Sequence, residues 1–549
     1  MIRLFSTRGV RDVSTTLRLV GRIVEKASPE SFVFVTDKEE HPQKFEYVIV
    51  KSREYVNGVL REVDVLAQVV GVLSSSTAFN SSLNLTTLER VHRAGIDDSN
   101  ILCTAKTLGF LAEENGRRVV LMPRRALFPG NPVFLAPDEL VSNFFSYEPE
   151  EGLYIGTLVS RSSVPVYLSV NGFRRHVAVI AQTGAGKSYT VGVIIEELLR
   201  LGGTVVIIDP HADYVFLSRD RDMKRHEYSD RILVFRNPNS TGRYSSSQLD
   251  NVNELVFKFS ELEGDEVAGV AGIPEGWSNV REVIRAAIKK LREKGNDYQV
   301  RDLIQVLEEM AARSGTKRVK EAAQRAINHL RRLTKFKVFG ERTTSLKDEI
   351  LKPGHVSVID LSGLNDASQD YIVSRILEGI FELRYTGQFR YPIFVVVEEA
   401  HRFVPGKESK KNTMSSQVIK TIAAEGRKFG VFLVLVTQRP SKIDSDALSQ
   451  CNSQIILRIT NPLDQRAVQE SSERLSADLL ADLPGLNVGE AVILGELTRV
   501  PVVVKVRARR TKEGGADIDL VEELRQAREE LRLTAPKIAP PAKGVFSEV

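Results

Sequence analysis

The sequence is poor in cysteine and in long hydrophobic runs. Its 549 residues include two cysteines, Cys103 and Cys451, which are far apart and belong to no CxxC pair. This pattern predicts a reducing compartment and no structural zinc site. The longest apolar runs, such as residues 431–436, have the length of a strand and fall well short of the roughly 20 residues that cross a bilayer. Because the amino terminus also has no apolar signal segment, we expect a cytoplasmic protein with no membrane partner.

Neither sign of charge dominates the chain, which has 76 Lys and Arg against 71 Asp and Glu and a formal net charge of +5. Its 42% apolar and 27% charged residues exclude a disordered or collagen-like chain, and its length predicts about two to four domains. The charge is nevertheless uneven. Residues 281–337 contain 16 Lys and Arg against 7 Asp and Glu, and residues 402–428 contain 7 against 2. Two basic regions therefore lie in an otherwise acidic protein, which favours a polyanionic partner at selected faces.

Residues 1–150 predict a small β-barrel or sandwich, because short runs rich in Val, Ile, Phe and Thr follow one another without intervening helices. The expected strands are 17–25, 31–37, 45–51, 63–73, 101–111 and 117–127. No catalytic constellation is visible in this region. We interpret it as a docking or oligomerisation module.

From residue 151 the chain alternates between strands and helices, which is typical of an α/β fold with a parallel sheet. Residues 151–250 and 350–475 are predicted to form this core. The expected strands are 177–180, 204–208, 232–235, 356–359, 393–397, 432–436 and 455–459, with a helix at 187–201. Residues 251–349 interrupt the alternation with amphipathic helices at 281–294, 301–313 and 317–335, which predict an inserted helical bundle. Residues 476–549 add two strands, a charged helix and a Pro/Ala-rich tail.

The segment Ala181-Gln-Thr-Gly-Ala-Gly-Lys-Ser188 follows a buried strand and opens a helix, the context of a phosphate-binding loop. Glycines permit the turns that aim backbone N–H groups at phosphate, and the helix N-terminus favours negative charge. Lys187 is expected to contact the β- and γ-phosphates, and the Ser188 hydroxyl to ligate Mg²⁺. Ala181 replaces the usual first glycine, which requires only a negative φ there. The predicted nucleotide-binding residues of this segment are Thr183, Gly184, Ala185, Gly186, Lys187, Ser188 and Tyr189.

Polar residues end three of the other predicted strands, at the sheet edge where α/β folds bind phosphates. Glu398 and Glu399 end the strand at 393–397, and we expect Glu398 to hold Mg²⁺ and Glu399 to act as general base on the attacking water. Asp209 ends the strand at 204–208 and is interpreted as a nucleotide-site residue, with a turn former as the alternative. Gln438 ends the strand at 432–436 and is interpreted as a catalytic γ-phosphate sensor or, alternatively, a loop hydrogen-bonder.

Four segments of this sequence occur together: Arg175-His176-Val-Ala-Val-Ile-Ala-Gln-Thr-Gly-Ala-Gly-Lys-Ser188, Ile-Ile-Asp209-Pro, Glu398-Glu399-Ala-His401 and Thr437-Gln438-Arg-Pro440. Their combination resembles the HerA/FtsK branch of RecA-like motor ATPases, and within it the archaeal HerA translocases. The resemblance covers nearly the whole chain. It implies a HAS-type N-terminal β-barrel, a RecA-like P-loop ATPase core with an inserted helical bundle, and a C-terminal brace.

The resemblance also implies roles for two arginines. Arg175 would contact nucleotide, and Arg427, in Ala-Glu-Gly-Arg-Lys-Phe-Gly430, would be the arginine finger that reaches the γ-phosphate of a neighbouring subunit. Lys428 stands next to Arg427, so the choice between the two stays open. A surface salt bridge is the alternative role for Arg427.

A basic loop at 405–412 contains Lys407, Lys410 and Lys411 and no aromatic residue. Lysines without aromatic platforms favour the phosphates of duplex DNA over single-stranded bases, although plain solvation of the loop is the alternative. The excess of positive charge in the helical insertion predicts a face for DNA or for a partner protein.

The predicted site residues indicate ATP and Mg²⁺ as cofactors, and the resemblance implies a homohexameric ring that threads double-stranded DNA and hydrolyses ATP between subunits. The resemblance adds a role in DNA-end resection with the NurA nuclease. Two alternatives remain: a secretion- or conjugation-type ring ATPase, for which we expect a membrane anchor, and a non-motor P-loop nucleotide switch, which does not need the second glutamate at position 399.

Overall fold

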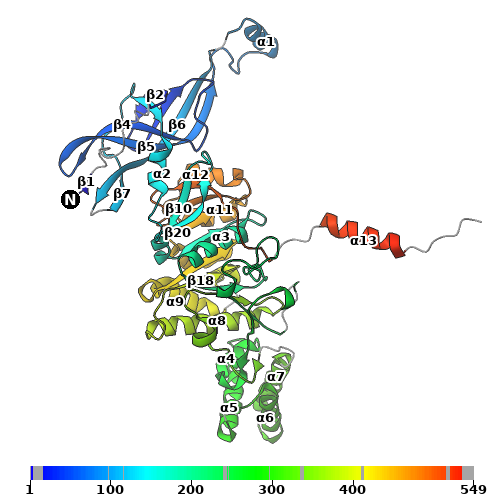
Figure 1. Ribbon diagram of the computed structural model, residues 1–549. Coiled ribbons are helices and arrows are strands. Elements are labelled where there is room, and N and C mark those ends of the chain that lie inside the picture. Colours follow the sequence, from blue (N-terminus) through cyan, green and yellow to red (C-terminus); the bar gives the residue numbers. More distant parts are fainter. Residues whose placement is uncertain are drawn as a thin grey trace, which may run out of the picture.

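The computed structural model describes residues 2–3, 17–96, 98–114, 117–238, 244, 246–295, 297–333, 339–409, 413–514 and 520–534. These residues form an elongated molecule, with a β-barrel at one end, an α/β body in the middle and a helical bundle at the other end (Figure 1). Helix α13 (Leu520–Thr534) projects away from the α/β body. In the described ranges, no helix has both the length and the hydropathy needed to cross a membrane.

The N-terminal region is a closed barrel. Within the described residues, six of its strands pair in the order β6, β3, β2, β8, β4, β5 and back to β6. Their bounds are β2 (Leu19–Ala27), β3 (Ser31–Thr36), β4 (Tyr47–Val56), β5 (Val59–Ser75), β6 (Asn100–Glu114) and β8 (Pro132–Leu135). Alternate residues such as Phe32 and Phe34 on β3, and Val48 and Val50 on β4, fill the interior. Closure pairs every strand of this ring on both sides, which leaves no open edge.

The predicted barrel is confirmed, but its details differ from the sequence pattern. In the part of the chain that the structure describes, strand β7 (Arg117–Leu121) pairs only with β6, and it ends earlier than the predicted strand 117–127. Strand β8 and helices α1 (Leu85–Arg93) and α2 (Asp138–Phe145) were not predicted. Strand β8 is only four residues long and begins with a proline, so its sequence carries little strand periodicity.

The α/β body contains one continuous sheet. In the described part of the chain, it has 12 strands in the order β10-β9-β22-β21-β20-β11-β19-β18-β12-β17-β13-β14. The bounds are β9 (Gly152–Leu158), β10 (Pro165–Ser169), β11 (Val177–Ile180), β12 (Thr204–Asp209), β13 (Ile232–Arg236), β14 (Val252–Glu254), β17 (Val356–Asp360), β18 (Ile393–Val397), β19 (Val431–Thr437), β20 (Ser453–Ile456), β21 (Glu490–Leu494) and β22 (Val502–Val506). Strands β20 to β14 are parallel, and β10, β9, β22 and β21 extend the sheet in antiparallel fashion. The predicted α/β class is confirmed, and the C-terminal strands belong to this sheet.

Both faces of the sheet are buried, which explains why its strands are continuously apolar. Along β12, Val205 and Ile207 face one hydrophobic cluster, while Val206 and Ile208 face the other. Helix α3 (Lys187–Arg200) packs on the first face, and α8 (Asp366–Tyr385) and α9 (Met414–Phe429) pack on the second.

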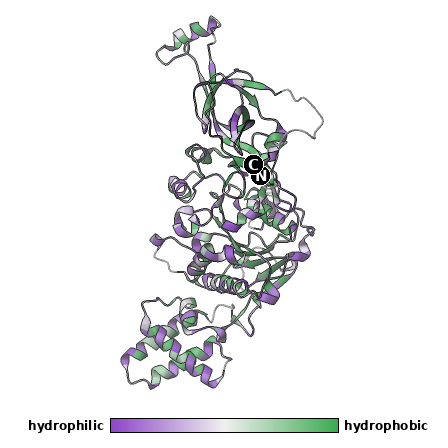
Figure 2. Cartoon of the chain, turned by 90° about the vertical axis from the view of Figure 1, so that its left-hand side faces the viewer, coloured by the Kyte–Doolittle hydropathy of each residue, from purple (hydrophilic) through white to green (hydrophobic). Residues whose placement is uncertain are grey.

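The insertion leaves and rejoins the body through β15 (Phe257–Lys258) and β16 (Phe339–Gly340), which pair with each other. It comprises α4 (Gly264–Val270), α5 (Ser278–Lys294), α6 (Val300–Arg313) and α7 (Lys317–Leu333). Hydrophilic and hydrophobic residues alternate around its helices (Figure 2). Their apolar stripes meet in a shared core that includes Ile284, Leu307 and Leu330, so the three predicted amphipathic helices are confirmed.

Candidate nucleotide site and its surroundings

Strand register brings the predicted site residues to one edge of the sheet. Ile180 of β11 pairs with Thr437 of β19, so the phosphate loop and Gln438 leave the sheet side by side. Val397 of β18 pairs with Ile208 of β12. Glu398, which follows β18, and Asp209, the last residue of β12, therefore lie at the same edge, where open α/β sheets bind ligands.

The phosphate loop turns through two glycines with positive φ, Gly184 at 75° and Gly186 at 96°. A Cβ atom at Gly184 would meet nothing within 4 Å, so the loop is open on this side. Ala181 does not have a positive φ, and alanine is therefore tolerated there. The Thr190 hydroxyl donates to the carbonyl of Gly186 at 2.9 Å and fixes the first turn of α3. The loop thus presents backbone N–H groups and a helix N-terminus, which fit a polyphosphate.

Lys187 lies between the two predicted carboxylates. Its Nζ is 2.5 Å from Oε2 of Glu398 and 3.3 Å from Oε1 of Glu399. Burial alone would lower the pKa of Lys187, but these two carboxylates outweigh burial and raise it, so the ammonium stays charged. The hydroxyl of Tyr214 donates to Oε1 of Glu398. The backbone N–H of Glu399 donates to Oε2 of Glu398 at 3.2 Å, so the carboxylate of Glu398, which is only 1% exposed, accepts from three donors.

Glu399 adopts an unusual backbone conformation with a φ of 48°. This left-handed turn ends β18 abruptly and sends the chain into the 3₁₀ segment Ala400–Arg402. The Nδ1 atom of His401 lies 3.2 Å from Oε2 of Glu399 and 3.2 Å from the hydroxyl oxygen of Thr437. Burial raises the pKa of Glu399, but His401 and Lys187 outweigh burial and lower it to about 2. The carboxylate is therefore ionised at neutral pH, as a general base must be.

Two site residues escaped the sequence analysis, Asp213 and Tyr214. The Ser188 hydroxyl donates to Oδ2 of Asp213 at 3.0 Å, and Tyr214 donates to Glu398 as described above. Asp209 shapes the loop that holds both, since its carboxylate accepts the backbone N–H of Asp213 at 3.0 Å and of Tyr214 at 2.9 Å. Asp209 is fully buried, so it lies behind the site as a positioning residue. The sequence feature that indicates these two residues is the run Asp-Pro-His-Ala-Asp-Tyr at the end of a buried strand.

Gln438 lies against the phosphate loop. Its Oε1 accepts a hydrogen bond of 2.5 Å from the Thr183 hydroxyl. The Thr437 hydroxyl accepts from the backbone N–H of Arg439 at 3.0 Å, which orients the turn after β19. The amide of Gln438 is therefore placed where a group bound at the loop would be in reach. At this sheet edge, the hydroxyl of Ser188 and the carboxylate of Glu398 supply the oxygen ligands that Mg²⁺ prefers. The residues therefore fit an Mg²⁺–nucleotide.

Arg175 and Arg427 lie together at the opposite edge of the sheet. Arg175 precedes the amino end of β11, whereas the phosphate loop follows its carboxyl end. Both arginines line a cavity of about 500 Å³ that also includes Arg474 and Glu496. Arg175 forms an ion pair with Glu496 at 3.2 Å. Arg427 is exposed and lies in the last turn of α9. Neither arginine lies beside the phosphate loop of its own chain.

Comparison with known proteins places the chain in a family. The family model described as the central domain of the helicase HerA matches residues 153–380. The DNA double-strand break repair helicase HerA of Pyrococcus furiosus is 31% identical over 92% of this chain and 96% of its own length. The chain belongs to the HerA helicase family. The HerA of Saccharolobus solfataricus is 30% identical over 93% of this chain and 96% of its own, and a probable helicase of Methanocaldococcus jannaschii is 32% identical over 86% and 89%.

Among solved structures, the bacterial conjugative coupling protein TrwB covers 70% of this chain and 94% of its own, with 14% identity and a TM-score of 0.48. It has also been solved with ADP and Mg²⁺. As a member of the HerA family with an intact phosphate loop and paired glutamates, the chain is an ATP-hydrolysing enzyme of the helicase or translocase type.

The predicted DNA-binding residues of this HerA-family chain are only partly described. Lys407 is exposed and lines a cavity of about 1200 Å³ that also includes His401 and Arg402. This cavity connects the basic loop to the segment that carries Glu399. Lys410 and Lys411 lie outside the described residues.

The bundle presents a basic surface on α7. Six of its exposed residues are basic and one, Glu321, is acidic; the basic ones are Lys317, Arg318, Lys320, Arg325, Arg331 and Arg332. Arg325 stacks over the ring of Trp277 at 5.4 Å, which holds its guanidinium at the surface. A DNA-facing or partner-facing role for this face stays a prediction.

Proposed function

We propose that this chain hydrolyses ATP to move along or unwind double-stranded DNA, that it acts as a homohexameric ring, and that it serves DNA-end resection together with the NurA nuclease. The observation that carries the proposal is the geometry at one sheet edge, where Lys187 lies within ion-pair distance of both Glu398 and Glu399. A mere nucleotide switch has no need of the second glutamate.

Each residue has a role in the proposed hydrolysis. The backbone N–H groups from Thr183 to Ser188 bind the phosphates, and Lys187 adds a positive charge beside them. The Ser188 hydroxyl and the carboxylate of Glu398 would hold Mg²⁺, which would neutralise charge on the phosphates when bound. Glu399 orients the attacking water and accepts its proton, while His401 orients Glu399. Gln438, which lies against the phosphate loop, orients the γ-phosphate. The Tyr189 hydroxyl accepts hydrogen bonds of 2.7 Å from Arg221 and from the backbone N–H of Arg509, which fix this residue on α3.

The position of the two arginines supports a ring. Arg175 and Arg427 lie at the sheet edge opposite to the phosphate loop, so neither can serve the nucleotide of its own chain. Each can serve a nucleotide only on a second copy that docks its phosphate-loop edge against this cavity. Such a head-to-tail contact uses two different surfaces, and it repeats into a ring when the rotation from one copy to the next closes.

The choice of DNA as substrate is supported by the names of the relatives. Several relatives are named DNA double-strand break repair helicases. A double-strand break has linear duplex ends, which are the proposed substrate. The basic loop at 405–412, which contains Lys407 and no aromatic residue, suits the backbone of duplex DNA. With DNA as its substrate, the proposed activity lies in the cytoplasm, and a nuclease such as NurA would process the ends that the motor delivers.

We expect linear duplex DNA to stimulate ATP hydrolysis, with a stimulation that falls as the salt concentration rises, because phosphate contacts release counterions. Steady-state ATPase rates with and without duplex DNA, over a range of NaCl concentrations, measure this effect. Lys187→Ala is the control and should abolish hydrolysis with and without DNA. A wild-type rate that duplex DNA leaves unchanged at low salt would contradict the proposal.

A further inference from the structure

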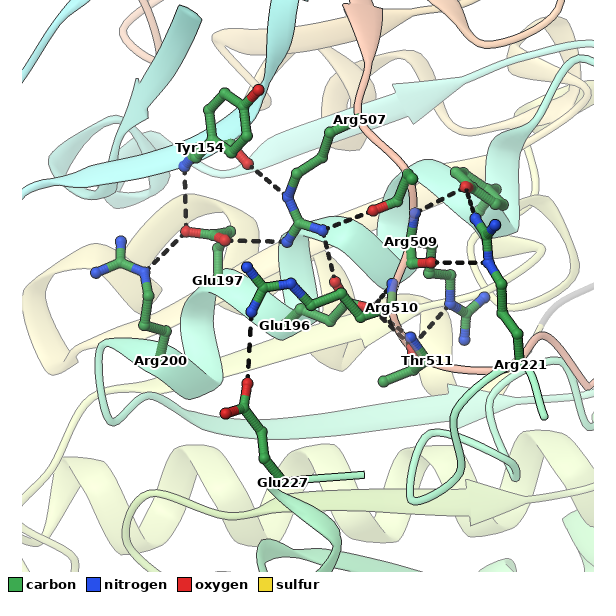
Figure 3. Close-up of polar contacts among 12 residues, drawn as sticks. Tyr154, Glu196, Glu197, Arg200, Arg221, Glu227, Arg507, Arg509, Arg510 and Thr511 are labelled. Atoms are coloured by element: carbon green, nitrogen blue, oxygen red, sulfur yellow. Dashed lines mark hydrogen bonds and ion pairs between the residues drawn. The ribbon is translucent and has the colours of Figure 1, made fainter. Parts of the chain in front are cut away.

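After β22 the chain runs back across the phosphate-loop helix α3 (Figure 3). We call residues 507–514 the C-terminal strap. They lie more than 300 residues away from α3 in the sequence, yet they contact its first three turns. Beyond the strap the described chain resumes at helix α13. The strap thus connects the C-terminal part of the chain to the helix that opens the nucleotide site.

The strap is anchored on two buried glutamates of α3. Oε1 of Glu196 accepts the backbone N–H groups of Arg510 and Thr511, both at 2.8 Å, and the Thr511 hydroxyl at 2.9 Å. Arg507 pairs with Oε2 of Glu196 at 2.8 Å and with Oε1 of Glu197 at 2.9 Å. Glu196 and Glu197 are 3% and 5% exposed, so their charges need these partners. The strap therefore has a defined path over the helix.

Arg509 is the strap residue that reaches the phosphate loop. Arg509 is only 2% exposed, and burial lowers the pKa of its guanidinium. Burying a guanidinium without hydrogen-bond partners would cost free energy, so its contacts matter. It donates to the Thr511 hydroxyl at 2.9 Å, to the carbonyl of Lys512 at 3.0 Å and to the carbonyl of Ser188 at 3.4 Å. The guanidinium of Arg509 lies against Gly192 of α3. A Cβ atom at position 192 would lie 2.4 Å from Nε of Arg509, so a glycine is needed there to make room for the arginine.

The end of the strap holds the other partner of Ser188. The backbone N–H of Gly514 donates to the carbonyl of Asp213 at 2.9 Å, and the carboxylate of Asp213 accepts the Ser188 hydroxyl at 3.0 Å. Next to it, Glu513 is half-buried and interacts electrostatically with Lys187. The strap thus contacts both the backbone carbonyl of Ser188, through Arg509, and Asp213, the acceptor of the Ser188 hydroxyl, through Gly514.

We propose that Arg509 is a positioning residue for Mg²⁺–nucleotide binding, which acts by holding Ser188 and, through the strap, Asp213 in the geometry that the metal requires. The inference rests on the proposed role of Ser188 as a ligand of Mg²⁺. A plain structural staple would use the same contacts to stabilise the fold, but it would not change how nucleotide binding depends on Mg²⁺.

Arg509→Lys tests the proposal in the full-length chain. Lysine keeps the charge but cannot donate to three separate acceptors in a fork. The readout is the binding of a fluorescent, non-hydrolysable ATP analogue during a titration with Mg²⁺, and the thermal unfolding midpoint is measured in parallel. We expect the Mg²⁺ concentration for half-maximal binding to rise about tenfold, as for other residues that orient metal ligands. Arg510→Gln is the matched control and should bind like the wild type. Among the described residues, the exposed side chain of Arg510 forms an ion pair only with the surface Glu227, at 3.4 Å.

Gly192→Ala provides a second variant that leaves Arg509 in place. An alanine ordinarily stabilises a helix interior, so a loss of Mg²⁺-dependent binding would come from displacement of the arginine. We expect this variant to reproduce the effect of Arg509→Lys. In the double variant Gly192→Ala/Arg509→Ala the clash is absent, and binding should be no weaker than in Arg509→Ala alone.

The outcomes separate this inference from the function on which it rests. If Arg509→Lys and Gly192→Ala lower the unfolding midpoint but keep the wild-type Mg²⁺ dependence, the strap is a structural staple and the inference is wrong. Ser188→Ala should weaken Mg²⁺-dependent binding more than either. If Ser188→Ala keeps the wild-type Mg²⁺ dependence, the proposed role of Ser188 fails, and the inference fails with it.

Discussion

Replacement of Glu399 by glutamine is expected to lower ATP hydrolysis by about 10²- to 10⁴-fold, the range that a general base contributes, while nucleotide binding persists. Glutamine has nearly the same shape, but it cannot accept a proton from the attacking water. The ionised state of Glu399 supports this role, since His401 and Lys187 hold its pKa at about 2 against the effect of burial. Steady-state ATPase rates together with binding of a non-hydrolysable analogue measure the two effects separately.

Glu398→Gln is the matched control for this variant. Glu398 contacts Lys187 and Tyr214, and we assign it to the metal, so its loss should change the Mg²⁺ dependence of nucleotide binding as well as the rate. A Glu399→Gln enzyme that turns over ATP like the wild type would contradict the assignment of the base. Equal loss of binding in both variants would assign both glutamates to the metal.

Replacement of Arg427 by alanine should lower hydrolysis by about 10³- to 10⁵-fold, as expected for an arginine finger. Because Arg427 lies at the sheet edge opposite to its own phosphate loop, we expect the effect to pass between subunits of the proposed ring. Mixing Arg427→Ala with Glu399→Gln chains should therefore recover part of the activity, since some interfaces then combine an intact arginine with an intact base. ATPase rates across mixing ratios measure this recovery.

Lys428→Ala is the control for the finger, because Lys428 is the exposed neighbour of Arg427 on the last turn of α9. A large loss in Lys428→Ala with little loss in Arg427→Ala would move the finger by one residue. Absence of recovery at every mixing ratio, in chains that still assemble, would contradict action between subunits. The same mixing experiment with Arg175→Ala tests whether this residue also serves a neighbouring nucleotide.

The sequence predicted those parts of the site that are local in the chain. The phosphate loop, the paired glutamates and Gln438 each follow a strongly apolar strand, so their place at a sheet edge follows from periodicity and from the rule for parallel sheets. The amphipathic helices of the insertion were predictable for the same reason. Apolar spacing decides where such elements lie, and the structure has them within a few residues of the expected bounds.

The remainder depends on contacts between distant segments. Arg509 looks like an ordinary residue of a basic run until the fold brings it against Ser188, 321 residues earlier in the chain. Asp213 has a site role only because Asp209 bends its loop toward the hydroxyl of Ser188. The sequence also did not indicate that Arg175 lies away from the phosphate loop. The two are close in sequence, but the four-residue strand β11 puts them at opposite sheet edges.

Displacement of a third DNA strand tests the central claim most directly, namely that hydrolysis at this site moves the chain along duplex DNA. A labelled oligonucleotide is annealed as a triplex to a linear duplex, and its release is followed after addition of ATP. We predict release by the wild-type chain with ATP, and none with Glu399→Gln or with a non-hydrolysable analogue. A wild-type chain that hydrolyses ATP in the presence of the duplex but never releases the third strand would contradict the account.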